Sequence, residues 1–218
     1  MLRLFNRGHL EEARFIAMLL TIGVQVFQQD ANGKQFRISH ADGHFGGSGD
    51  GILFDLPDLP GQYVLGEFKT HSLKSFTKLV KEGVAVAKPE HVVQMNIYME
   101  KMKIPVGLYA AVCKDNDALH MEIIIADIDL ANSHLDLGEY LINLYEPPKK
   151  LNSSPGHWEC RYCDHRPICH LNAVPDLNCR TCKFSKTVEN GEWVCTFTGE
   201  VLDKHAQLKG CEKHNRIA

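Results

Sequence analysis

Hydrophobic residues recur at a helical period in four segments of the chain. In residues 8–20 the apolar positions fall on one helical face, and a glycine soon ends the pattern. Residues 72–83 open with a serine and close with a glycine, and residues 88–103 carry a proline in the first turn. A fourth helix is predicted over residues 128–146, with an irregularity near Gly138.

Six other segments are rich in β-branched and aromatic residues and therefore predict strands. An Asn32-Gly33 pair predicts a hairpin between the first two, and a turn at residues 57–61 joins the next two. The order is one helix, four strands, two helices, two strands and a helix, which predicts an α/β (α+β) fold with a central mixed β-sheet flanked by helices. The strands are predicted at residues 24–29, 34–40, 51–55, 62–70, 106–113 and 118–127.

The chain divides by composition into a main domain and a small tail. Its 218 residues are 44% apolar, which is enough for a genuine core. Residues 146–156 mix Pro, Lys, Asn and Ser without periodicity and predict a linker, so we expect domains at residues 1–150 and 151–218. No apolar run could cross a bilayer, and charges come too early for a signal peptide, so we expect a cytoplasmic protein with no membrane partner.

The formal net charge of −3 excludes a uniformly basic coat for nucleic acid but permits a local groove. Up to residue 150 there are 15 Lys and Arg against 19 Asp and Glu, and the remainder has 9 against 8. An acidic main domain suits a site that collects divalent cations, although surface carboxylates that serve solubility are the simpler explanation.

Seven of the eight cysteines lie between Cys160 and Cys211. Closely spaced cysteines without a secretory signal favour metal ligation over disulfides. Cys179, Cys182 and Cys195, with Cys211, have the spacing of a C-x2-C knuckle and two later ligands, which suits tetrahedral Zn²⁺. The alternative is four unrelated buried thiols.

A second group, Cys160, Cys163 and Cys169, needs a fourth ligand to complete a metal site. Three histidines are near enough in sequence to supply it. They are His157, His165 and His170.

Asp50, Glu67 and Lys69 are polar residues that strand formation does not require. Glu67 and Lys69 are two apart and leave the same face of one predicted strand. With Asp50 on the neighbouring strand, two carboxylates would converge where Mg²⁺ could bind, beside an ammonium group. That set suits phosphodiester hydrolysis. The alternative is a solvated hairpin face.

Gln94 and Tyr98 are four apart and share one face of the helix predicted over residues 88–103. Such a pair could hydrogen-bond substrate phosphates or the attacking water. Without the strand residues it would be a half-buried amphipathic face. His40, His44 and His71 also lie near these segments, and nothing beyond proximity distinguishes them from solvated loop histidines.

These three motifs together resemble the PD-(D/E)XK nucleases, in the branch with RecB-type nuclease domains and phage recombination exonucleases. "GSGD" at residues 47–50 is similar to the branch's G-x-x-D, "EFK" at 67–69 to its acidic-x-Lys, and "QMNIY" at 94–98 to its Q-x-x-x-Y. The resemblance covers most of residues 1–145. It implies a restriction-endonuclease-like core, with the zinc-binding module appended at the C-terminus.

The resemblance also implies roles for individual residues. Asp50 and Glu67, with the backbone carbonyl of Phe68, would hold Mg²⁺ or Mn²⁺, and Lys69 would position the nucleophilic water. Gln94 and Tyr98 would support the active site or the DNA backbone. The branch carries a histidine on its first helix, sometimes as a metal ligand, and His9, followed by Glu12, is the candidate; a helix cap or surface histidine is the alternative.

For the first cysteine group the resemblance offers two metals. Iron–sulfur members of the branch share the C-x2-C-x5-C spacing but take a fourth cysteine from before the core, which this chain lacks. Zinc is therefore preferred over an iron–sulfur cluster at Cys160, Cys163 and Cys169. His170 is the preferred fourth ligand because it resembles the Cys-His ending of related phage proteins.

The function implied is a metal-dependent deoxyribonuclease, a phage or prophage recombination or repair exonuclease acting on DNA. A single-strand annealing or recombination protein would be its partner, in the host cytoplasm if the gene is a phage's. The alternative is a catalytically inactive DNA- or protein-binding module on a nuclease-like fold with zinc fingers.

Overall fold

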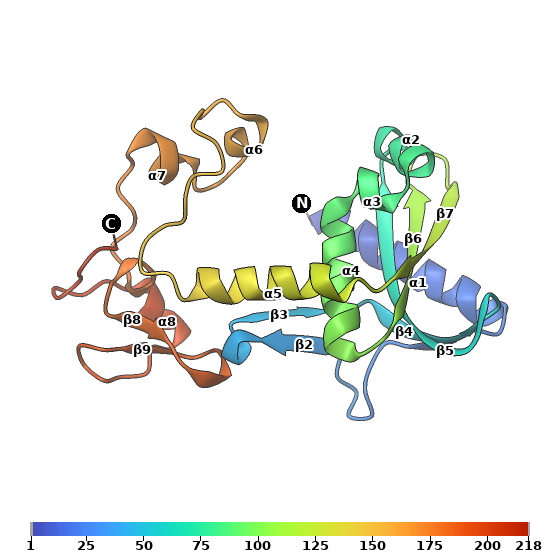
Figure 1. Cartoon of the computed structure of the whole chain (residues 1–218), viewed down its shortest axis with the longest axis horizontal. Coiled ribbons are helices and arrows are strands. Elements are labelled where there is room, and N and C mark those ends of the chain that lie inside the picture. The colour runs from blue at the N-terminus through green and yellow to red at the C-terminus, as the bar shows by residue number, and fades with distance from the viewer. Residues whose placement is uncertain (1, 218) are drawn as a thin grey trace. The chain divides into compact units, whose positions relative to one another are not determined.

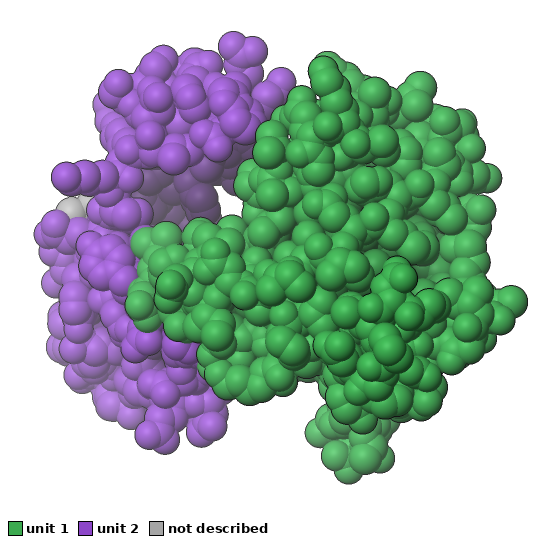
Figure 2. Space-filling model, turned by 45° about the vertical axis from the view of Figure 1, so that its right-hand side comes forward, with its two compact units in different colours: residues 1–39, 46–137 green, residues 40–45, 138–218 purple. Residues whose placement is uncertain are grey.

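The computed structural model describes residues 2–217 and gives the side chains from Asn6 onward. The chain forms two compact units, shown in separate colours in Figure 2. Unit 1 takes in the chain up to Ser39 and Gly46–Leu137, and unit 2 takes in His40–Phe45 and the chain from Gly138 onward. No helix among the described residues is both long and apolar enough to span a bilayer.

A five-stranded mixed sheet forms the centre of unit 1, as the sequence predicts. Its order is β1-β4-β5-β6-β7, and all neighbours are antiparallel except β5 and β6, which are parallel. A parallel pair needs a long crossover, and here the helices α2 to α4 make it. The strands are β1 (Gln25–Phe27), β4 (Gly51–Leu56), β5 (Leu59–His71), β6 (Val106–Cys113) and β7 (Leu119–Ile125).

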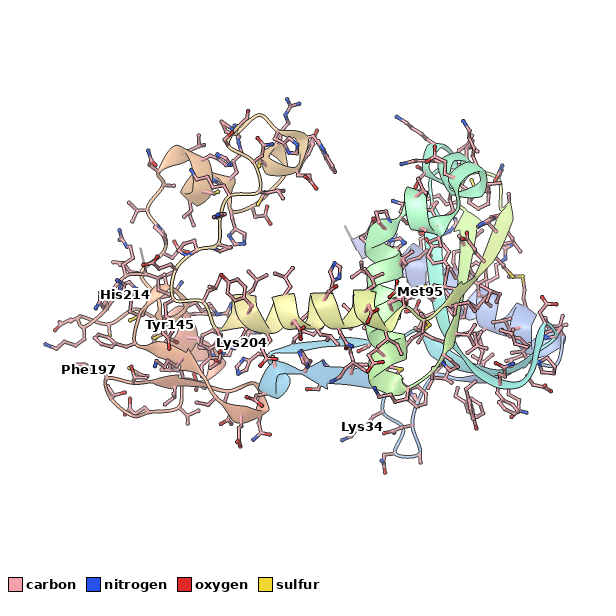
Figure 3. All side chains as sticks on the ribbon, viewed as in Figure 1. Lys34, Met95, Tyr145, Phe197, Lys204 and His214 are labelled. Atoms are coloured by element: carbon pink, nitrogen blue, oxygen red, sulfur yellow. The ribbon has the colours of Figure 1, made fainter. Side chains whose placement is uncertain are left out.

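Helices α1, α2 and α4 contact the strands of the sheet (Figure 1). Phe15 and Leu19 of α1 pack into the cluster that contains Val64 and Phe68 of β5. Met95 of α4, labelled in Figure 3, is fully buried. The helices are α1 (Leu2–Thr21), α2 (Leu73–Glu82), α3 (Val84–Ala87), α4 (Pro89–Met102) and α5 (Ile128–Ile142), the last continuous through Gly138.

The predicted hairpin at Asn32-Gly33 is wrong in its extent. The turn closes on one isolated bridge, between Gln29 and Gln35. The flanking strands then separate: β1 joins the central sheet, and β2 (Arg37–His40) pairs with β3 (Phe45–Ser48) in a sheet of its own. Tertiary pairing therefore overrides the local turn signal, because β1 pairs with β4.

Unit 2 consists of short helices and strands. The cysteine spacing predicted a metal-binding module there but not its individual elements. A two-stranded antiparallel sheet, β8 with β9, lies among single-turn helices. Capping supports some of these turns: Asn178 and Thr181 form a capping box, and the Asp203 side chain accepts from the backbone N–H of Ala206. The elements are α6 (Trp158–Arg161), α7 (Arg166–Leu171), η2 (Cys179–Thr181), β8 (Ser185–Thr187), η3 (Glu189–Gly191), β9 (Trp193–Cys195) and α8 (Lys204–Leu208).

Packing of α1 on the sheet predicts the cost of truncating its core side chain. Phe15 is 2% exposed and stacks on Phe68, with ring centroids 5.4 Å apart. We expect Phe15→Ala to lower the free energy of unfolding by about 3 kcal/mol or more, measured by urea denaturation. Leu20→Ala on the same helix is the matched control, because Leu20 is 54% exposed. Equal losses in the two variants would contradict this account of the core.

Candidate active site

Neighbouring strands bring Asp50 and Glu67 together at one end of the β4–β5 pair. Gly51, the first residue of β4, pairs with Gly66 of β5. Asp50, which precedes Gly51, therefore stands beside Glu67, which follows Gly66. The backbone N–H of Phe68 donates a 2.8 Å hydrogen bond to Asp50 Oδ2. This bond fixes the Asp50 carboxylate against β5, on the level predicted from the sequence.

Glu67 is completely buried, which is rare for a carboxylate. Its Oε1 contacts the Lys69 ammonium group, and neither of its oxygens has a hydrogen bond of normal geometry within residues 2–217. Burial raises the pKa of Glu67 to about 7, the nearby Asp50 adds to the rise, and Lys69 opposes it. Lys69 compensates one negative charge, but Asp50 places a second beside it, so the group as a whole is short of positive charge.

Lys69 remains the positively charged partner of both carboxylates. Burial lowers its pKa, but the carboxylates of Glu67 and Asp50 outweigh burial, and the net pKa is raised. The side chain is 26% exposed, so it reaches from the buried Glu67 toward solvent.

The glycine run before Asp50 makes room for Tyr98. A Cβ atom on Gly47 would lie 2.2 Å from the Tyr98 hydroxyl, so only glycine fits there without displacing the ring. Gln94 Nε2 lies 3.5 Å from the same hydroxyl. Burial raises the pKa of Tyr98, and the charges of Glu67, Lys69 and Asp50 also act on it. The structure thus places the Q-x-x-x-Y pair beside the strand residues.

A cavity of about 420 Å³ is lined by Asp50 and Lys69, and α1 forms one wall of it. His9 and Glu12 line it, with His9 Nδ1 3.8 Å from Glu12 Oε2. Burial raises the pKa of Glu12, and Asp50 raises it further, so Glu12 belongs to the same acidic group. The side chain of His9 is 80% exposed, which leaves Glu12 the more enclosed of the two.

Lys88 and His91 also line this cavity, and the sequence reasoning missed them. They stand three apart where α4 begins, and the only sequence signal was their position just ahead of Gln94 on the same helix.

Treating His71 as a solvated loop histidine is wrong. It ends β5, is 5% exposed, and shares a 2.9 Å hydrogen bond with the Tyr109 hydroxyl. Burial lowers its pKa to about 4, assisted by Lys88, His91 and Lys69. His40 and His44 instead belong to unit 2, where His44 Nε2 is 2.7 Å from the carbonyl of Val188.

Four cysteines of unit 2 surround one cavity of about 190 Å³, together with Phe197 and His214, which Figure 3 labels. They do not converge, since no three His, Cys, Asp or Glu side chains within residues 2–217 stand close enough to hold an ion. The cysteines are Cys179, Cys182, Cys195 and Cys211.

Backbone N–H groups point at two of these sulfurs. Asn215 N–H donates to Cys182 Sγ at 3.4 Å. Burial raises the pKa of Cys195, but hydrogen bonds from Thr198 and Phe197 outweigh burial and lower it overall. N–H donors of this kind favour the thiolate form, which is the form that ligates metal.

The other cysteine group lies on α6 and α7 and in the loop between them. Cys160 is buried, Cys163 is exposed and Cys169 is half-buried. Two nearby histidine nitrogens, His170 Nε2 and His157 Nδ1, are buried without a hydrogen-bond partner in the described part of the chain. Among the described residues these side chains do not converge with two others to hold an ion, so the fourth ligand stays a prediction.

Comparison with known proteins shows partial likeness only. No family model and no curated protein matches the chain. It is similar to the alkaline exonuclease LHK-Exo from Laribacter hongkongensis, at 21% identity and a TM-score of 0.46, over 62% of this chain and 64% of that one. The LHK-Exo complex with dAMP has the same identity and TM-score, over 62% of this chain and 63% of that one. SSO0001 has 19% identity and a TM-score of 0.42, over 77% of this chain and 70% of that one.

The match therefore spans less than two thirds of LHK-Exo. At TM-scores below 0.5 these likenesses do not decide the function, which has to be inferred from the residues of the site.

The buried histidine at the end of β5 predicts a pH-dependent stability. The pKa of His71 is depressed to about 4 in the folded state, while an unfolded histidine titrates near 6.5. The unfolded chain therefore binds more protons between these pH values. Stability is fully present above about pH 6.5 and falls as the pH drops toward 4, by on the order of 2 kcal/mol from this group.

Urea denaturation of unit 1 at pH 7.5, 5.5 and 4.5 would measure this loss. His71→Gln should remove part of the pH dependence, and the remainder belongs to His91, whose pKa burial also lowers to about 4. The exposed His9 provides the control substitution, His9→Gln. A profile that keeps its slope in His71→Gln would show that another group carries the effect.

Proposed function

We propose that unit 1 is a metal-dependent nuclease that hydrolyses phosphodiester bonds in DNA. The observation that carries this proposal is the Glu67 carboxylate, completely buried and without normal hydrogen bonds among the described residues, where Asp50 and Lys69 converge. Burying such a charge costs several kcal/mol unless a partner compensates it. Lys69 compensates one of the two carboxylates, and a bound cation would compensate the other.

The donor set fits Mg²⁺ or Mn²⁺. Asp50 and Glu67 offer carboxylate oxygens, and the carbonyl of Phe68 lies between Glu67 and Lys69 in the chain. Hard oxygen ligands are those that these ions prefer. Bound there, the cation would offset phosphate charge and make a coordinated water more acidic.

The surrounding residues have separate parts in the proposed reaction. Lys69 holds the attacking water in line and offsets negative charge that develops on the phosphate oxygens. Gln94 and Tyr98 donate hydrogen bonds to the phosphate group or the water. Glu12 closes the acidic wall of the cavity, with His9 near the opening.

The mode of cleavage, the biological role and the partner protein are further parts of this proposal. Exonuclease action, a place in phage or prophage recombination and an annealing partner protein follow from the sequence resemblance alone. A protein that binds DNA without cleaving it would be the alternative, an inactive module on the same fold.

We propose in addition that unit 2 binds structural zinc. Cys179, Cys182, Cys195 and Cys211 share one cavity, and a backbone N–H donates to Cys182 Sγ. Despite burial, hydrogen bonds lower the pKa of Cys195, whereas burial and the neighbouring thiols raise that of Cys179. A small segment with little apolar burial needs ligation to offset its chain entropy. Cys160, Cys163, Cys169 and His170 form the second proposed site, with an iron–sulfur cluster as its alternative.

Substitutions in the strand residues test the nuclease proposal. We expect Glu67→Gln and Lys69→Ala to lower the rate of Mg²⁺-dependent cleavage by at least about a hundredfold, because each removes a charge that acts in the transition state. Thermal unfolding should show that both variants stay folded. Glu82→Gln is the matched control, since Glu82 is an exposed carboxylate on α2.

The measurement uses end-labelled linear DNA and closed circular DNA, each with Mg²⁺, Mn²⁺ or EDTA. Full cleavage by Glu67→Gln or Lys69→Ala would refute the assignment. DNA binding with no cleavage by the wild-type protein would favour the inactive module. Calorimetry on Asp50→Asn should show weaker Mg²⁺ binding, because one anionic ligand is gone.

Metal content tests the zinc proposal independently of catalysis. We expect about two zinc ions per chain, and Cys179→Ser should remove one of them and make the C-terminal segment sensitive to protease, because ligation supplies on the order of 10 kcal/mol in small zinc modules. Cys113→Ala is the control, since Cys113 lies in β6 of unit 1. An unchanged zinc content in Cys179→Ser would rule out the four-cysteine site. Iron together with absorption of visible light would show that the second site, at Cys160, Cys163 and Cys169, holds an iron–sulfur cluster and not zinc.

A further inference from the structure

We propose that Lys88 and His91 form a phosphate-binding subsite beside the catalytic residues, with Tyr109 and His71 positioning His91. The subsite would hold a phosphate of the nucleic acid next to the bond that is cleaved. It rests on the proposed nuclease function for its substrate, and it can be tested by binding alone.

The cavity has an acidic side and a basic side. Glu12 and Asp50 line the first. Lys69, Lys88 and His91 line the second, and the two lysines lie near enough to act on the His91 ring. A phosphodiester substrate needs both, because the cation occupies the acidic side while the remaining phosphate charge needs basic groups.

A chain of hydrogen bonds holds the His91 ring at its inner nitrogen. His91 Nδ1 is 2.8 Å from the Tyr109 hydroxyl, which is also 2.9 Å from His71 Nε2. The other nitrogen of His71 is 3.1 Å from Ser75 Oγ. Tyr109 is fully buried and burial raises its pKa, so the hydroxyl keeps the single proton that it can donate.

The chain can run in two directions, because each imidazole nitrogen donates or accepts according to its tautomer. When Ser75 donates to His71 Nδ1, His71 Nε2 must donate to the Tyr109 oxygen, and the Tyr109 hydroxyl then donates to His91 Nδ1. In that state His91 Nε2 carries the free N–H. The nearest carboxylate oxygen, on Glu90, is 4.0 Å away, beyond hydrogen-bond distance.

A phosphate oxygen selects this direction, because in the reverse one His91 Nε2 would carry no hydrogen. His91 Nε2–H then serves as a neutral donor. Burial lowers the pKa of His91 to about 4, helped by Lys69 and Lys88 and opposed by Glu90. The ring is fixed in orientation by its inner hydrogen bond, so it can aim the N–H at a ligand without holding charge.

Lys88 supplies the charge that His91 lacks. Its ammonium lies 3.6 Å from Glu90 Oε1, and Glu90 is 60% exposed. Lys88 is 26% exposed, but its partner Glu90 is solvent-exposed, so a phosphate can replace Glu90 beside Lys88 at small cost. Lys88 also precedes Pro89, the first residue of the 14-residue helix α4, whose N-terminal end adds a partial positive charge. A charged donor and a neutral directed donor together suit a phosphate oxygen pair.

Binding measurements on the full chain test the subsite without requiring cleavage. The probes are inorganic phosphate and a short DNA, with or without a 5′-phosphate, in metal-free buffer at several salt concentrations. We expect Lys88→Ala to weaken DNA binding about tenfold and to reduce the salt slope by about one, as removal of one phosphate contact does. Lys81→Ala is the control, since Lys81 is an exposed lysine on α2.

Tyr109→Phe tests the positioning role, because it removes one hydroxyl and touches no substrate. We expect inorganic phosphate to shift the NMR signals of the His91 ring nitrogens in the wild-type protein, and to shift them far less in Tyr109→Phe. If the protein proves to be a nuclease, both variants should raise KM more than they lower kcat. Loss that is confined to 5′-phosphorylated DNA identifies a terminal phosphate as the ligand, and equal loss with both DNAs identifies a backbone phosphate.

The outcomes separate this inference from the proposed function. If Lys88→Ala and Lys81→Ala bind DNA and phosphate alike, the subsite does not exist, whether or not the protein cleaves DNA. If the wild-type protein cleaves nothing but Lys88→Ala loses phosphate binding, the subsite stands and the nuclease proposal fails.

Discussion

The Glu67 carboxylate is completely buried, and the elements around it all act on the cost of keeping a charge there. Lys69, two residues along the same strand, contacts it, while Asp50 on the next strand adds a second negative charge. A folded chain that served stability alone would gain by replacing this group with an apolar side chain. The excess negative charge is the feature that makes a cation site the most economical explanation.

One face of β5 packs in the apolar core, and the other face carries the polar residues of the candidate site. Val64 and Phe68 point toward α1 and join its apolar cluster, so they hold the strand in place. Glu67, Lys69 and His71 occupy the alternate positions and belong to the opposite face, because side chains alternate along a strand. The rigid apolar face therefore fixes the position of the polar face, which is what a site that must hold a charge in one geometry requires.

Much of this arrangement could be predicted from the sequence, because period and spacing are local properties. The helix at α4 and the strand pair around Glu67 followed from residue spacing, and so did the shared face of Gln94 and Tyr98. The prediction of a β1–β2 hairpin was wrong because strand pairing depends on the whole sheet, and β1 pairs with β4.

What spacing could not give is burial. His71 and Tyr109 read as an isolated polar residue and an ordinary strand aromatic, and only tertiary packing joins them into one hydrogen-bonded chain. Glu12 likewise reaches the acidic group only because α1 packs across the strands.

A chain of net charge −3 can hold a polyanion only if repulsion is relieved at the point of contact. In the proposed nuclease the acidic side of the cavity repels phosphate until a cation compensates Asp50 and Glu67, whereas Lys88 and His91 attract phosphate throughout. Cation and nucleic acid should therefore raise each other's affinity by the same factor, because linkage is reciprocal. The basic side then retains the substrate, and the acidic side makes productive binding depend on the metal.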